Sequence, residues 1–229
     1  MSNKPGYTPK ELLLQVFDTN EKRYKEITRL DEKEMSQYKE YLARFNETHD
    51  ESNNFSTVEK GKSLESLVGF LLARSAVFEV HQNLRNSTNE IDQLLILNSK
   101  GNYFKNEGLL NLPGEHFLSE CKNYQGKIGV TWIGKLYSLI ESTNSQIGLI
   151  FSYHGITGDG WKDATGLVKK LYLRREDINK KVYILDFNIK DFNSILDGHS
   201  ILELIDAKVK SLKFDTDLSR FIEKHPAEE

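Results

Sequence analysis

The sequence predicts an α/β protein in which one mixed sheet is flanked by helices. Beyond residue 59, amphipathic helical patterns alternate with short apolar runs that are bounded by Gly, Pro and Asn. Their order is helix, three strands, helix, strand, helix, strand, which is typical of a single sheet covered by helices. The 229 residues, 38% of them hydrophobic, are enough for one sizeable core.

The first part of the chain is predicted to be helical. Residues 1–55 are expected to form a helical arm and linker, and residues 56–229 an α/β domain with a C-terminal helical extension. Thr8 to Glu11 combine an N-cap, a proline at the first helical position and a capping glutamate, and residues 31–34 repeat the capping pattern. Apolar and aromatic residues follow both caps, so the arm is expected to pack on the domain or on a second copy. The polar residues 46–57 are the expected linker.

Residues 98–116 contain four turn-forming Gly and Pro residues and are predicted to form a long loop. The remaining segments divide by their hydrophobic period. Helices are expected over residues 62–74, 129–142, 161–176 and 201–212, and strands over residues 77–81, 90–97, 117–122, 147–152 and 182–187.

Composition excludes several classes of protein. The single cysteine, Cys121, excludes an intramolecular disulfide framework and a multi-cysteine zinc site. The chain has no apolar run near the roughly 18 residues of a membrane span and no apolar secretion signal, so a cytoplasmic protein is expected. Gly61-Lys62-Ser63 matches the end of a Walker A loop, but Ser56 stands where that loop needs glycine, and no nucleotide cofactor is expected.

Charge is unevenly distributed along the chain. The formal net charge is -3, yet residues 61–175 carry 13 Lys/Arg against 10 Asp/Glu, whereas residues 176–229 carry 8 against 12. A basic central region mildly favours a polyanionic partner such as nucleic acid. The acidic C-terminal part is read as a solvated surface.

Acidic residues mark the predicted helix at 62–74 and the ends of two predicted strands. Glu65 lies on the helix, Asp92 begins one strand, and Glu120 and Lys122 end another, where alternation places them on one face. If the two strands are neighbours, the Cβ atoms of Asp92 and Glu120 lie about 5 Å apart, an unfavourable meeting of like charges. A divalent cation would offset it, and Mg²⁺ prefers a few carboxylates with waters and phosphate oxygens. A lysine beside the ion can orient or deprotonate the attacking water.

Simpler interpretations exist for each of these residues. The Glu120/Lys122 pair can be a solvated salt bridge, and Glu65 can simply cap a helix turn. Glu90 is a further carboxylate without an assigned role. The order of the motifs favours the metal site, because ionisable residues gathered at strand ends usually mark function.

At these residues the chain resembles the PD-(D/E)xK nuclease superfamily, whose restriction-endonuclease-like fold has an αβββαβ core. Within it the chain is most similar to Mrr-like restriction endonucleases and archaeal Holliday-junction resolvases. The matching segments are Gly61–Glu65, Asn89–Asp92 and Glu120–Asn123, and the resemblance covers roughly residues 59–190. Ile91 stands where the motif has its proline.

The resemblance implies a metal-dependent endonuclease that hydrolyses DNA phosphodiester bonds in restriction, defence or DNA processing. It implies that Asp92 and Glu120 bind Mg²⁺, for which Mn²⁺ can substitute, with the Cys121 carbonyl as a further ligand. Lys122 would handle the nucleophilic water, and Glu65 would bind or orient a second metal or its water. A homodimer is expected, since cleavage of two strands calls for two active sites.

Other residues are expected to contact nucleic acid or to be ordinary surface groups. A glycine-rich segment, 154–161, could approach a phosphate, and Trp132 and Trp161 are expected to be packing residues. A catalytically silent nucleic-acid-binding or assembly module and an RNA or single-strand nuclease remain alternatives. The expected nucleic-acid contacts are Asn123, Gln125, Lys127, Lys135, Arg174 and Arg175.

Overall fold

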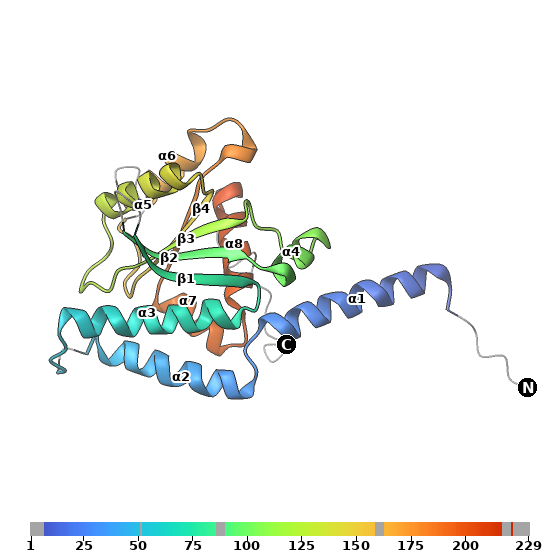
Figure 1. The fold of residues 1–229 in the computed structure, drawn as a ribbon, viewed down its shortest axis with the longest axis horizontal. Coiled ribbons are helices and arrows are strands. Elements are labelled where there is room, and N and C mark those ends of the chain that lie inside the picture. Colours follow the sequence, from blue (N-terminus) through green and yellow to red (C-terminus); the bar gives the residue numbers. More distant parts are fainter. Residues whose placement is uncertain (1–6, 51, 86–89, 159–162, 217–220, 222–229) are drawn as a thin grey trace, which may run out of the picture.

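A computed structural model describes residues 7–50, 52–85, 90–158, 163–216 and 221. It confirms the α/β fold, with a five-stranded sheet flanked by helices (Figure 1). The strands are β1 (Phe78–Arg85), β2 (Glu90–Leu97), β3 (His116–Cys121), β4 (Ile147–Phe151) and β5 (Tyr183–Phe187). The helices are α1 (Pro9–Thr28), α2 (Glu32–Glu47), α3 (Thr57–Arg74), α4 (Ser99–Asn106), α5 (Val130–Thr143), α6 (Ala164–Leu173), α7 (Ile189–Leu196) and α8 (Ile201–Phe214), with a 3-10 helix at Ile178–Lys180.

The sheet is mixed and its strands follow chain order, β1-β2-β3-β4-β5. β1, β2 and β3 are antiparallel neighbours, whereas β3, β4 and β5 are parallel. In the β2–β3 register Gln93 is opposite Ser119, so the next residues outward, Asp92 and Glu120, come side by side. The carboxyl ends of β3, β4 and β5 lie at this same edge, where ligand sites of α/β folds usually form.

Side-chain alternation gives the sheet two buried faces. Phe117, Leu149 and Phe187 belong to one apolar cluster with residues of α2, α3, α7 and α8. Leu118 and Ile150 belong to a second cluster with residues of α5 and α6. Figure 1 shows α5 and α6 on the opposite side of the sheet from α2 and α3. Glu120 and Lys122 follow Leu118 by two and four residues, and therefore share the α5 side.

The prediction that residues 98–116 form a long loop is wrong, because α4 begins inside them. The Asn98 side chain accepts hydrogen bonds from the N–H groups of Lys100 and Gly101 and so caps the helix. Phe104 on α4 is buried, with its ring 5.0 Å from that of Tyr24. One apolar anchor on eight residues leaves too little periodicity for a prediction from the sequence.

Other boundaries also differ from the prediction. α3 begins at Thr57, five residues early, because Ser56 and Glu59 form a capping box. β1 continues to Arg85, α6 occupies only Ala164–Leu173 of the predicted 161–176, and α7 was not predicted at all.

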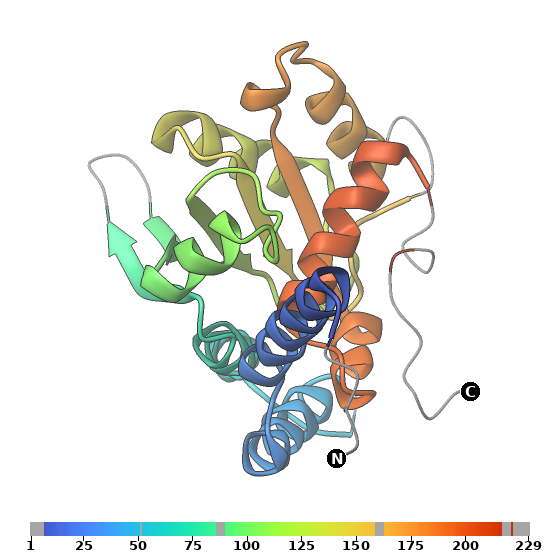
Figure 2. The same cartoon turned by 90° about the vertical axis from the view of Figure 1, so that its right-hand side faces the viewer.

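The predicted helical arm consists of two helices with different environments. α2 belongs to the core, because Tyr38 and Phe45 are fully buried and the Tyr38 hydroxyl donates a 2.7 Å hydrogen bond to the Phe192 carbonyl of α7. α1 instead leaves the domain beside α8, as Figures 1 and 2 show from two directions. Among the described residues, no helix has both the length and the apolar character needed to cross a membrane.

Candidate functional site

Three of the four predicted catalytic side chains meet at the edge of the sheet. The Lys122 ammonium nitrogen lies 2.8 Å from Glu120 Oε2 and 3.1 Å from Asp92 Oδ2. Asp92 Oδ2 also accepts a 2.9 Å hydrogen bond from the Cys121 N–H. The exposed fractions of the Glu120, Lys122 and Asp92 side chains are 10%, 15% and 24%. The group is therefore largely buried but open on one side.

Backbone geometry explains why these side chains converge. Asp92 comes beside Glu120 because β2 and β3 are antiparallel neighbours. The Lys122 N–H donates a 2.8 Å hydrogen bond to the Phe151 carbonyl, which extends the β3–β4 ladder one residue past Cys121. Lys122 thus keeps the strand alternation and lies on the same face as Glu120.

The expected meeting of like charges is offset by the Lys122 ammonium group, which contacts both carboxylates. Burial raises the pKa of Glu120, and the neighbouring Asp92 charge raises it further, against the lowering effect of Lys122. Burial alone would lower the pKa of Lys122, but the carboxylates of Glu120 and Asp92 outweigh it and raise that pKa. Lys122 is therefore charged at neutral pH and donates hydrogen bonds; it does not take a proton from water in this arrangement.

A cavity of about 390 Å³ opens beside the three charged residues. Its far wall comes from α5, where Lys135 lies with its ammonium nitrogen 4.2 Å from the centre of the Trp132 ring. The Lys122 nitrogen is 5.0 Å from the same ring. Two lysines thus flank one aromatic side chain, and both can face an anionic ligand in the cavity. The rest of the wall and floor is formed by Leu136, Ser138, Leu139 and Ile150.

The donor set fits a magnesium ion better than a metal held entirely by protein. Among the residues that the structure describes, no group of three or more His, Cys, Asp or Glu side chains is arranged to hold a metal. Asp92 and Glu120 supply two neighbouring carboxylates, and both lie within hydrogen-bond distance of the Lys122 ammonium group. Mg²⁺ is usually bound by one or two carboxylates, with water and substrate phosphate completing its shell, and Mn²⁺ accepts the same oxygen ligands.

Glu65, the fourth predicted catalytic residue, is exposed on α3 and is not part of the cavity wall. Its charge nevertheless acts on Cys121. The pKa of the buried Cys121 thiol is raised well above its ordinary value, first by burial and then by the negative charges of Asp92 and Glu65. Cys121 is therefore an uncharged thiol, and the roles of Glu65 and of the Cys121 carbonyl as metal ligands stay predictions.

Of the predicted nucleic-acid contacts, Lys135 lines the cavity and Asn123 is engaged within the fold. The Asn123 amide donates to the Lys60 carbonyl at 2.6 Å and to Thr48 Oγ1 at 3.3 Å, and its oxygen contacts His49. Asn123 thus joins the end of β3 to the end of α2 and the first turns of α3. These hydrogen bonds indicate that Asn123 stabilises the packing of the three elements.

The other predicted contacts lie away from the cavity wall. Gln125 and Lys127 are exposed after β3, and Arg174 is exposed at the end of α6. Arg175 binds Glu141 of α5, with its Nη2 atom 2.5 and 2.6 Å from the two carboxylate oxygens. Of the glycine-rich segment 154–161, residues beyond 158 lie outside the described part, as do Trp161 and the Glu90 side chain.

Two structural features were not predicted from the sequence, one in the cavity wall and one beside Asn123. Trp132, expected to be a packing residue, forms part of the cavity wall. It is three residues from Lys135 on the helix that follows the E-x-K segment. This spacing places both side chains on one face of the helix, and it was the signal available in the sequence. His49, within the predicted linker, stacks on Tyr153 with ring centres 3.8 Å apart, and burial lowers the pKa of His49. No local pattern marked that contact.

Comparison of the chain with protein-family models, with curated proteins and with solved structures finds no match. The resemblance to the PD-(D/E)xK nucleases stays a prediction. It depends on the motif residues, of which Asp92, Glu120 and Lys122 meet at one sheet edge.

Proposed function

We propose that this protein is a Mg²⁺-dependent nuclease of the PD-(D/E)xK type that hydrolyses phosphodiester bonds of DNA. One observation carries the proposal: two carboxylates from adjacent strands share the Lys122 ammonium group at the edge of a cavity. Oxygen ligands, a lysine and an anion-sized space are the components that phosphodiester hydrolysis needs. The free Cys121 thiol fits the reducing conditions of a cytoplasm.

Each residue has a defined part in this reaction. A divalent ion held by Asp92 and Glu120 would polarise the phosphoryl group and acidify a bound water. Lys122, charged and held in place by two carboxylates, would orient the attacking water and stabilise negative charge that develops on the phosphate. Lys135 on the opposite wall would hold a phosphate oxygen, and Trp132 would limit the access of bulk water.

A second function is favoured by a specific observation. Because the Lys122 ammonium group already pairs with both Asp92 and Glu120, the three side chains also form an ion-pair network without a metal. Such a network would suit a catalytically silent nucleic-acid-binding module. The two functions predict different results when a divalent ion is added to bound DNA: the nuclease cleaves it, and the silent module does not.

The test incubates the full chain with plasmid, linear duplex and RNA, in Mg²⁺, Mn²⁺ or EDTA. We expect DNA cleavage that EDTA abolishes and that Asp92→Asn and Glu120→Gln each reduce by at least about 100-fold, the typical effect of removing a group that stabilises the transition state. Glu79→Gln, which changes an exposed carboxylate on β1, is the matched control and should cleave as wild type does.

Cleavage by Asp92→Asn at the wild-type rate would remove the mechanism. DNA binding without cleavage in either metal would identify the silent module. Cleavage confined to RNA would keep the chemistry and change the substrate.

A further inference from the structure

Two aromatic side chains, Tyr124 and Trp132, lie next to each other beside the cavity of the candidate site. Their ring centres are 5.7 Å apart and their planes are inclined by 37°. Trp132 belongs to the cavity wall, whereas Tyr124 is outside the wall and is 45% exposed. The pair therefore runs from the cavity, where a phosphate would bind, out to the protein surface. We call Tyr124 and Trp132 the aromatic platform.

The backbone that carries Tyr124 is held on both sides. The side chain of Asn123, the residue before it, donates a 2.6 Å hydrogen bond to the Lys60 carbonyl of α3. Farther along the same loop, the Ile128 N–H donates a 2.8 Å hydrogen bond to the Gly155 carbonyl. An exposed ring on a backbone that is already fixed is suited to bind a flat ligand, because little conformational entropy is lost on binding.

The basic groups of the cavity are close to the aromatic platform. The ammonium nitrogens of Lys122 and Lys135 lie 5.0 and 4.2 Å from the centre of the Trp132 ring. In a nucleotide only the sugar separates the phosphate from the base, so a phosphate beside Lys122 brings a base within reach of the platform. Basic groups that contact the phosphates, combined with aromatic rings on which bases stack, are the features by which proteins bind single strands.

The packing of the two rings indicates which form of DNA fits. Because Trp132 packs against Tyr124, only the other side of the Tyr124 ring is open to a base. A side chain that wedges between the base pairs of a duplex needs both of its faces free. Within an intact duplex each base is also covered by its stacked neighbours, so it has no free face to offer. The platform therefore fits a base that is unpaired and unstacked.

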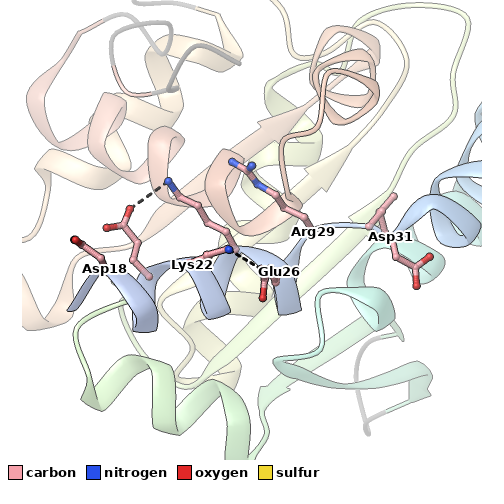
Figure 3. A pocket seen from close by; sticks show the side chains of 8 residues that line it. Asp18, Lys22, Glu26, Arg29 and Asp31 are labelled. Atoms are coloured by element: carbon pink, nitrogen blue, oxygen red, sulfur yellow. Dashed lines mark ion pairs between the residues drawn. The ribbon is translucent and has the colours of Figure 1, made fainter. Parts of the chain in front are cut away.

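The cavity of about 530 Å³ along α1 lacks these features. It is lined mainly by charged residues, and Figure 3 shows how they lie. Lys22 pairs with Glu26 at 3.8 Å, and Arg29 pairs with Glu203 of α8 at 2.6 Å. Acidic and basic groups are mixed there, and none of the described residues that line this cavity is aromatic. The combination of lysines and an aromatic surface thus distinguishes the cavity at the sheet edge.

We propose that the DNA bound by this protein has an unpaired base next to the phosphate in the cavity, and that this base stacks on Tyr124. The substrate class is then a single strand, or a single-stranded end or flap of a duplex. The cavity volume of about 390 Å³ is in the range of sites for one small molecule, which suits a single nucleotide. The inference rests on the proposed function, because it takes the phosphate to lie beside Asp92, Glu120 and Lys122.

Fluorescence anisotropy in EDTA tests the stacking without cleavage, at low salt, where nucleic-acid binding is strongest. We expect the full chain to bind a labelled single strand at least about tenfold more tightly than a duplex of the same length. Tyr124→Leu should weaken single-strand binding by about 5- to 150-fold, the loss typical of one base–aromatic stack. Tyr124→Phe, which keeps the ring, should bind as wild type does. Tyr103→Leu, at a 53% exposed tyrosine on α4, is the matched control and should also bind as wild type does.

An oligonucleotide made of abasic residues separates stacking from phosphate contacts. It keeps the phosphates and offers no base, so wild type should bind it more weakly, by at least the factor that Tyr124→Leu causes with the normal strand. Tyr124→Leu should then cause no further loss. An equal effect of Tyr124→Leu on both strands would show that Tyr124 acts through the fold and would overturn the stacking. Equal affinity for single strand and duplex, or no binding of the single strand, would overturn the proposal as well.

Cleavage in Mg²⁺ separates this inference from the proposed function. Single-strand binding that depends on Tyr124, without cleavage in Mg²⁺ or Mn²⁺, would support the aromatic platform and reject the nuclease. Cleavage of a blunt linear duplex at a rate that Tyr124→Leu leaves unchanged would support the nuclease and reject the platform.

Discussion

At the scale of single residues, Lys122 is the residue of the candidate site that pairs with both carboxylates. Its ammonium group compensates two largely buried carboxylates that come from different strands. The folded pKa of Lys122 is raised, so the stability it contributes is fully present below the pKa of an unfolded lysine, about 10.4, and is lost only as pH rises through the folded value. Across the physiological range the network is complete.

Lys122→Met should destabilise the protein at pH 7 by about 3 kcal/mol or more, because it leaves Asp92 and Glu120 without their common cation. Because burial raises the pKa of Glu120, this carboxylate takes up a proton as the pH falls, which removes the repulsion, so the deficit should shrink at acidic pH. Urea unfolding of the wild type and of Lys122→Met at pH 7 and at pH 4.5 measures this difference in the free energy of unfolding. Lys190→Met, at an exposed lysine, should change stability by no more than about 0.5 kcal/mol. A deficit that is equal at both pH values would indicate lost packing instead of charge.

At the scale of elements, α4 shows how a short helix is held by one close contact. A Cβ atom added at Gly101 would lie 2.5 Å from the Val77 carbonyl oxygen, which belongs to the backbone and cannot move aside cheaply. The helix therefore sits directly on the chain that leads into β1. Gly134 of α5 differs, since among the described residues no atom outside its own helix turn lies within 4 Å of such a Cβ atom.

Gly101→Ala should therefore cost about 1–3 kcal/mol, as overpacking usually does, despite the better helix propensity of alanine. Gly134→Ala should raise stability by about 0.5–1 kcal/mol through propensity alone. Thermal and urea unfolding of both variants measure the difference. Equal effects of the two substitutions would show that α4 can shift away from Val77.

At the scale of the whole molecule, α2 unites the predicted arm with the α/β domain. Tyr38, Leu42 and Phe45 are buried in the same cluster as residues of β3, β4 and β5. Each such side chain contributes about 1.5–3 kcal/mol on burial, so their sum approaches the whole stability of an ordinary domain. The boundary predicted at residue 55 thus separates residues whose side chains belong to one hydrophobic core.

Residues 30–229, which lack α1, should fold cooperatively, whereas residues 56–229 should not fold stably. Circular dichroism with urea titration distinguishes the two. Cooperative unfolding of residues 56–229 at the wild-type midpoint would show that α2 is dispensable.

Local sequence patterns predicted much of the fold because they encode backbone conformation and side-chain direction. The capping residues at Thr8 and Asp31 mark true helix starts, and the five apolar runs correspond to the five strands. α4 and α7 escaped prediction because each is eight residues long, which is too short to show a clear helical period, although Asn98 and Asn188 cap them locally.

For the candidate site, the sequence by itself determined that Glu120 and Lys122 share a face, since strand alternation has a period of two. Only the tertiary structure decided that Lys122 contacts Asp92, that α5 closes the cavity with Trp132, and that Glu65 is outside its wall. Spacing along the chain fixes which way a side chain points. What it meets there depends on how distant elements pack, which no local pattern records.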